Sequence, residues 1–279
     1  MKAFFLNSEP ENPKYVLVGV PYDETETYQK GAAKGVESFR TASESIETYS
    51  LRLARDLETI GFRDEGDIAC PKDPERAIEA IEQRAKVVFE RKVFPVFIGG
   101  EHTVTLGILK GALATHPDLR IIVLDAHLDL RHEYNGERIN HATWAHRAGE
   151  ILGPERIMFF GIRSGIPDEI VYARTNRLNW FPKIDIRMVE QFALGYPIYL
   201  SIDIDALDPA LCPGVGNPEP GGLSYEDVMS FLVILSNYKF VGMDLVEINP
   251  SMDAGEVTSV IGAELVREAL LAASLRRSR

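Results

Sequence analysis

The sequence predicts an α/β fold in which a mostly parallel sheet is covered by helices on both faces. Two observations carry this prediction. Apolar runs of strand length alternate with helical patterns along the chain. In addition, uninterrupted apolar runs are typical of strands that are buried on both faces, as parallel strands are. With 279 residues, 45% of them hydrophobic, the chain is long enough to bury a large core.

Six apolar runs are expected to be strands, and helices are expected between and after them. The strands are 15–20, 94–98, 119–124, 156–162, 196–202 and 240–246. The helices are 36–55, 74–91, a helix that starts at Thr103 and a closing helix from about residue 255. Apolar residues recur at helical spacing in 74–91 and in the closing helix. No repeat, linker or low-complexity tract divides the chain, so we predict a single domain over 1–279.

Composition excludes several classes of partner. The net charge of −12 argues against nucleic-acid binding and against an anionic membrane surface. No apolar stretch reaches transmembrane length, and the apolar run near the N-terminus is too short for a signal peptide. Cys70 and Cys212 form no spaced pair. We therefore expect a cytoplasmic protein with reduced thiols and a small-molecule substrate.

Two clusters of polar residues follow directly after apolar runs. Asp125, His127 and Asp129 form the first, and Asp203 and Asp205 form the second. Residues two apart in a strand point to the same side, so each cluster can converge on one point. Ligands bind beyond the carboxyl ends of the strands in sheets of this class. Closely spaced carboxylates resist ionising together, and bound divalent cations remove that difficulty.

A third strand end supplies His102, which follows Gly99 and Gly100. The complete set offers two imidazoles and four carboxylates, a combination that suits Mn²⁺, with Fe²⁺, Co²⁺ and Zn²⁺ as alternatives. Four aspartates balance the charge of two divalent ions. Two ions about 3.5–4 Å apart would lower the pKa of a shared water towards neutrality.

These motifs, in this order, resemble the ureohydrolase family of arginases and agmatinases. The match covers most of the chain, in five segments: Gly99-Gly100-Glu101-His102, Asp125-Ala126-His127-Leu128-Asp129, Ser201 to Pro209, Pro218 to Leu223, and Asp244 to Pro250. The resemblance implies a three-layer α/β/α fold, two Mn²⁺ per subunit, and hydrolysis of a guanidino group to urea and an amine. It also implies a homo-oligomer, a trimer or a hexamer.

By position, the resemblance implies a role for each site residue. The ligands of the first ion would be His102, Asp125, Asp129 and Asp205, and those of the second His127, Asp125, Asp203 and Asp205. Glu247 corresponds to the carboxylate that binds the guanidinium, a planar group whose paired N–H donors a carboxylate accepts. His141 corresponds to the proton-shuttling histidine. Asp129 would hold the attacking water, so Asp129, His141 and Glu247 are the catalytic candidates, with His141 and Glu247 also binding substrate.

Two local features bear on the branch of the family and on the substrate. His141 is followed by Ala142 where the family commonly has glycine, which resembles archaeal-type agmatinases. The segment Leu130 to Asn140 is short, as in agmatinases, and agmatine, cleaved to urea and putrescine, is the first candidate substrate. Glu133, Tyr134 or Glu137 could receive the distal ammonium of agmatine. Arg131 or Arg138 would instead prefer a carboxylate.

Several alternatives stay open at this point. A guanidinobutyrase, another guanidino-acid ureohydrolase or an arginase would use the same centre. A deacetylase-like enzyme would need fewer acidic ligands around one zinc ion. A non-enzymatic metal- or polyamine-binding protein would be favoured by the loss of a ligand or of Glu247, and all of these residues are present.

Overall fold

The computed structural model describes residues 11–277, and an eight-stranded sheet forms its centre. The strand order is β4-β1-β5-β10-β9-β6-β7-β8, and every neighbouring pair is parallel. The strands are β1 (Tyr15–Val20), β4 (Phe62–Asp67), β5 (Phe94–Gly99), β6 (Arg120–Leu124), β7 (Ile157–Phe160), β8 (Asn179–Phe181), β9 (Pro197–Asp203) and β10 (Lys239–Val246). The predicted α/β class with a parallel sheet is confirmed.

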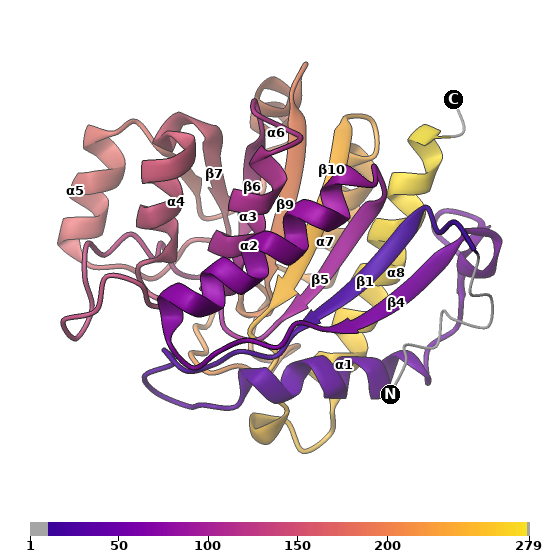
Figure 1. Cartoon of the computed structure of the whole chain (residues 1–279), viewed down its shortest axis with the longest axis horizontal. Helices are drawn as coiled ribbons and strands as arrows, with labels where there is room; N and C mark the ends of the chain where they lie inside the picture. The colour runs from indigo at the N-terminus through magenta and orange to yellow at the C-terminus, as the bar shows by residue number, and fades with distance from the viewer. Residues whose placement is uncertain (1–10, 278–279) are drawn as a thin grey trace.

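Helices cover both faces of this sheet, which gives three layers (Figure 1). One face packs against α2 (Pro74–Glu90), α3 (Val104–Leu113), α4 (Trp144–Leu152) and α5 (Pro167–Thr175). The other packs against α1 (Gly35–Ser43), α6 (Ile186–Ala193), α7 (Tyr225–Leu235) and α8 (Val257–Arg277). Alternate residues of β1 enter the two cores: Val16 and Val18 face one side, and Tyr15 and Leu17 the other. This alternation explains why strands such as β1 and β5 have no charged residue on either face.

The expected helix over 36–55 is wrong in its second half. Helix α1 ends at Ser43, and β2 (Tyr49–Ser50) then pairs antiparallel with β3 (Arg55–Asp56). The hydroxyls of Ser43 and Ser45 donate to backbone carbonyls three residues earlier, each at 2.7 Å. Such serine side chains compete with the helical hydrogen-bond pattern, which favours a turn at this point.

No helix among the described residues is long and apolar enough to cross a membrane. The apolar run near the N-terminus, which is too short for a signal peptide, lies outside the described residues. Cys70 and Cys212 are both free.

Candidate metal centre and active site

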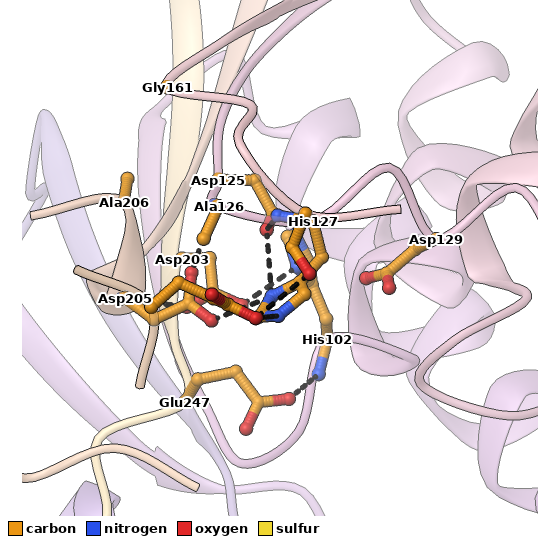
Figure 2. A network of polar contacts seen from close by, with 12 residues as sticks. His102, Asp125, Ala126, His127, Asp129, Gly161, Asp203, Asp205, Ala206 and Glu247 are labelled. Carbon is orange, nitrogen blue, oxygen red and sulfur yellow. Dashed lines mark hydrogen bonds and ion pairs between the residues drawn. The ribbon is translucent and has the colours of Figure 1, made fainter. Parts of the chain in front are cut away.

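Four adjacent strands bring the candidate residues to one edge of the sheet. The strands β5, β10, β9 and β6 are neighbours, and all end at the same edge because they are parallel. His102 follows β5, Asp125 to Asp129 follow β6, Asp203 ends β9, and Glu247 follows β10. Figure 2 shows these side chains converging from the four strand ends, with Asp129 on one side of the cluster and Asp205 on the other.

The backbone around the cluster is tightly constrained. Any side chain at Gly100 would be impossible, because a Cβ there would lie 1.9 Å from the carbonyl oxygen of Tyr22. Asp129 and Glu247 have φ values of 50° and 66°, in the left-handed region that non-glycine residues seldom adopt. Strained backbone of this kind concentrates at functional sites, where the surrounding structure holds it in place. Both residues are also catalytic candidates by the family resemblance.

His102 is the centre of the first group of candidate ligands. Its Nδ1 lies 3.1 Å from Asp125 Oδ2 and 3.2 Å from Asp203 Oδ2. Ligand atoms of His102, Asp125 and Asp129 all lie within 4.8 Å of one another. On the far side of the ring, Nε2 lies 2.9 Å from Ser201 Oγ, and Ser201 donates in turn to Asp244. Partners of this kind fix the orientation of a histidine whose other nitrogen binds a metal.

His127 is the centre of the second group. Its Nδ1 lies 3.0 Å from Asp205 Oδ2 and 3.7 Å from Asp125 Oδ1. These three residues also offer ligand atoms within 4.8 Å of one another, so Asp125 is shared by both groups. The outer nitrogen, Nε2, faces Glu219 at 3.8 Å. The two groups therefore have the arrangement of two ion sites that share a carboxylate.

The electrostatics of the cluster favour the binding of cations. Burial, and then neighbouring carboxylates, raise the pKa values of Asp125, Asp129 and Asp203 well above the usual range. Burial acts to lower the pKa of His127, but Asp205 and Asp125 raise it to about 10. His102 Nδ1 and Asp125 Oδ2 are buried and have no hydrogen-bond partner. Buried polar atoms normally have a partner, so these two atoms, 3.1 Å apart in an acidic cluster, fit one divalent ion shared between them in the His102 group.

Glu247 lies beside the cluster with two further buried carboxylates. Its Oε1 accepts a hydrogen bond of 2.8 Å from the backbone N–H of His102. Burial, and then the charges of Glu26 and Glu101, raise the pKa of Glu247 well above the usual range. Burial likewise raises the pKa of Glu26 to about 7 and that of Glu101 to about 8. A cation with several N–H donors would stabilise the ionised form of Glu247.

A cavity of about 460 Å³ opens in front of these groups. Glu247, His127, Asp129 and Asp205 are among the residues that line it. The cavity is large enough for a small organic substrate. The carboxylates thus face a space that a cationic ligand can enter.

His141 also lines the cavity, and two threonines that carry no recognisable sequence signal, Thr25 and Thr27, set its orientation. Its Nδ1 lies 2.8 Å from the carbonyl oxygen of Thr25, so Nδ1 carries the hydrogen. The other nitrogen, Nε2, lies 3.3 Å from Thr27 Oγ1, which donates to it. Burial lowers the pKa of His141 to about 4, so this histidine is neutral at pH 7 with a lone pair on Nε2.

The residues expected to meet the tail of the substrate separate into two sets. Arg131 and Tyr134 line the cavity, with the guanidinium of Arg131 over the Tyr134 ring at 4.4 Å. Arg138 is exposed and lies 3.6 Å from Glu150 instead. Glu133 and Glu137 are exposed and are not among the lining residues. Of the two arginines, only Arg131 can therefore meet a ligand in this cavity.

Comparisons with known proteins agree with this geometry. A sequence profile described as the arginase family matches residues 13–272. An agmatinase of Bacillus cereus is 38% identical over 276 residues, which are 96% of this chain and 95% of that protein. The N(1)-aminopropylagmatine ureohydrolase of Thermococcus kodakarensis is 36% identical over 278 residues, 95% of this chain and 93% of that protein. The crystal structure of the agmatine ureohydrolase of Thermoplasma volcanium superposes with a TM-score of 0.91 at 32% identity, and covers 99% of this chain and 95% of that one.

Proposed function

The chain belongs to the arginase family, and on that premise we propose that it is an agmatinase, a hydrolase that cleaves agmatine to urea and putrescine. The observation that carries the proposal is the set of six candidate ligands at neighbouring strand ends, with Glu247 beside them in a cavity that four of the six line. Agmatinases from bacteria and archaea match nearly the whole chain at similar identities. The domain is proposed to span residues 1–279, since one continuous sheet runs through the described part.

We assign the two ions as Mn²⁺, because four carboxylates and two imidazoles are hard and borderline ligands. The proposed ligands are His102, Asp125, His127, Asp129, Asp203 and Asp205. The resemblance suggests Asp205 for both ions but leaves the division of ligands between them open, and in the structure Asp205 lies against His127 whereas Asp203 lies against His102. We therefore propose that Asp203 also serves the first ion. Bound there, the ions would supply a water whose pKa is lowered towards neutrality.

The side chains of the cavity define how a guanidinium would be held. Glu247 would accept paired N–H groups of the substrate, while its bond to the N–H of His102 fixes the carboxylate. Asp129, which lines the cavity, would orient the attacking water by accepting its hydrogen bond. Addition of water to the central carbon and cleavage of its bond to the alkylated nitrogen give urea and an amine. The charge of the substrate would be balanced by Glu247 throughout.

His141 is proposed to move protons between this reaction and solvent. Its Nε2 is the unprotonated nitrogen, because Nδ1 donates to the Thr25 carbonyl. A neutral imidazole can accept a proton from water and pass it to the leaving amine. Thr27, also in the cavity wall, keeps Nε2 turned towards that space.

A second candidate substrate class is favoured by one observation. Arg131 lines the cavity, and a guanidinium there would attract the carboxylate of a guanidino acid such as 4-guanidinobutyrate. The guanidinium of Arg131, however, lies over the ring of Tyr134, and this cation–π contact already gives its positive charge a partner. Agmatine therefore remains the first candidate, and the guanidino acid is the alternative that a substrate panel must include.

The test is urea release from a panel of agmatine, arginine, 4-guanidinobutyrate and 3-guanidinopropionate. Each substrate is offered to Mn²⁺-loaded protein and to protein stripped by a chelator. We expect metal-dependent turnover of agmatine. Turnover of 4-guanidinobutyrate instead would indicate that its carboxylate binds Arg131. An Arg131→Gln variant should then lose its activity on 4-guanidinobutyrate. Silence on every substrate with metal bound would favour a deacetylase-like enzyme or a polyamine-binding protein. Sedimentation of the same preparation tests the proposed homo-oligomer.

A further inference from the structure

A tryptophan outside the proposed ligand set touches two of its members. Trp144 begins helix α4 and is fully buried. Its indole Nε1–H donates to Asp129 Oδ2 at 2.9 Å. Its ring stacks on the imidazole of His102, with the centroids 4.2 Å apart and the planes 25° apart. His102 and Asp129 belong to the same group of candidate ligands, the one centred on His102.

The start of helix α4 holds Asp129 by the backbone as well. The N–H of His146, in the first turn, donates to the carbonyl oxygen of Asp129 at 3.3 Å. The helix start is itself fixed, since Thr143 accepts from the N–H of Asn140 and donates to the carbonyl oxygens of Asn140 and Arg138. Asp129 therefore keeps its left-handed backbone between two contacts from one helix.

The hydrogen bond also orients the carboxylate of Asp129. An indole N–H is a donor only, so it takes one acceptor position on Oδ2, while Oδ1 stays clear of this donor. The stack limits the rotation of the His102 ring, whose far side is already fixed by Ser201. A single side chain thus restrains one carboxylate and one imidazole of the first group. His127, in the second group, has no ring stacked on it among the described residues, and its outer nitrogen faces the partly exposed Glu219.

We propose that Trp144 is a positioning residue that sets the metal affinity of the His102 site and leaves the His127 site unaffected. This inference rests on the proposed function, because it takes His102 and Asp129 as metal ligands. A tryptophan that only filled the core would be replaced by phenylalanine without any effect on metal binding. Loss of an outer hydrogen-bond partner of a metal ligand typically weakens metal binding by about 10- to 100-fold.

The experiment compares Trp144→Phe with Trp180→Phe, the only other tryptophan of the chain. Trp180 lies in strand β8 at the edge of the sheet, whereas the proposed ligands follow or end the strands β5, β6 and β9. Mn²⁺ alone is the probe, and binding is followed by calorimetry and by the electron paramagnetic resonance signal of free Mn²⁺. We expect Trp144→Phe to weaken one of the two binding steps by about 10- to 100-fold. The other step should keep its native affinity, and Trp180→Phe should keep both.

Two further measurements separate positioning from a general loss of packing. In Trp180→Phe, the emission of Trp144 should be quenched as the His102 site fills, and this requires no catalysis. Replacement of Trp144 by 3-benzothienylalanine keeps the ring and its stack but removes the N–H, so it should reproduce the selective loss. Native affinity at both sites in the folded variants, or equal weakening of both sites, would overturn the proposal. A native chain that binds no Mn²⁺ would overturn the proposed function, and this inference with it.

Discussion

The change Glu247→Gln separates the role of this side chain in binding from its effect on stability. Glutamine keeps the shape of the residue, and its carbonyl oxygen can still accept the 2.8 Å hydrogen bond from the N–H of His102. The substitution removes one negative charge from a buried group that also contains Glu26 and Glu101. Activity and stability are therefore expected to change in opposite directions.

The expected loss of activity follows from the guanidinium contact. Two charge-assisted hydrogen bonds of about 1.5–3 kcal/mol each would be replaced by weaker bonds to a neutral amide. Removing one member of a buried ion pair costs about 3–5 kcal/mol. At about 1.4 kcal/mol per factor of ten, kcat/KM for agmatine should fall on the order of 10²–10⁴-fold.

The stability of the metal-free protein should rise in the same variant. Burial and two neighbouring carboxylates disfavour the charge of Glu247, so a neutral side chain relieves repulsion in the folded state. Each kcal/mol gained raises the melting temperature by roughly 2–4 °C in a chain of about this size. Thermal unfolding at pH 8 without metal measures this gain in stability. Urea release from the metal-loaded enzyme measures the loss of activity.

Glu26→Gln is the matched control. Glu26 is a buried carboxylate of the same cluster, but it is not among the residues that line the cavity. The Glu26→Gln substitution should also raise the melting temperature of the metal-free protein, while kcat/KM for agmatine stays close to the native value. A Glu247→Gln enzyme that retains native kcat/KM would refute the role assigned to this carboxylate. A lower melting temperature in both variants would refute the electrostatic argument.

Three further outcomes are expected. Asp125→Asn should reduce bound Mn²⁺ below two per subunit by elemental analysis and abolish urea release, because Asp125 belongs to both ligand groups; full activity would rule out the two-metal assignment. In the metal-free protein, stability should fall as pH rises from about 5 to about 8. Burial raises the folded-state pKa of Glu26 to about 7 and that of Glu101 to about 8, whereas unfolded carboxylates ionise near 4, so the folded chain holds protons that the unfolded chain has released. A melting temperature that climbs over this range would contradict that sign. Thr27→Val should lower kcat more than it raises KM, because it removes the donor that orients His141 Nε2. Thr27→Ser should restore kcat, and failure of that rescue would assign Thr27 to packing.

The centre of the sheet was predictable from the sequence, and its edges were not. Strands such as β5 and β9 lie between two other strands and under helices on both faces, so nearly every residue is apolar. Strand β4, by contrast, has the sequence FRDEGD and pairs along one side only. Strand β8 is three residues long and only partly buried. An edge strand can expose polar residues without leaving a pairing group buried, so hydropathy alone does not identify it.

The candidate metal ligands were also predictable from local sequence, because their residue types and spacing form a recognisable pattern. Metal ligands must be of a few residue types, and those on one strand end must be spaced by two, as Asp125 and His127 are. The residues that orient them obey no such spacing. Trp144 reaches Asp129 from a helix start, and Thr25 reaches His141 across 116 positions of sequence through its backbone carbonyl. Contacts of this kind depend on where loops pack, which no local pattern records.

The same features that make the site reactive make it unfavourable for the metal-free fold. Asp125, Asp129 and Asp203 are buried together with raised pKa values, and both Asp129 and Glu247 have left-handed backbone. Such costs persist only where the surrounding structure fixes the positions, and here four adjacent parallel strands do so. Cations that bind the folded chain and not the unfolded chain would offset these costs by mass action. Metal binding at the proposed site would therefore be coupled to folding through the same carboxylates, and chelation should lower stability as well as activity.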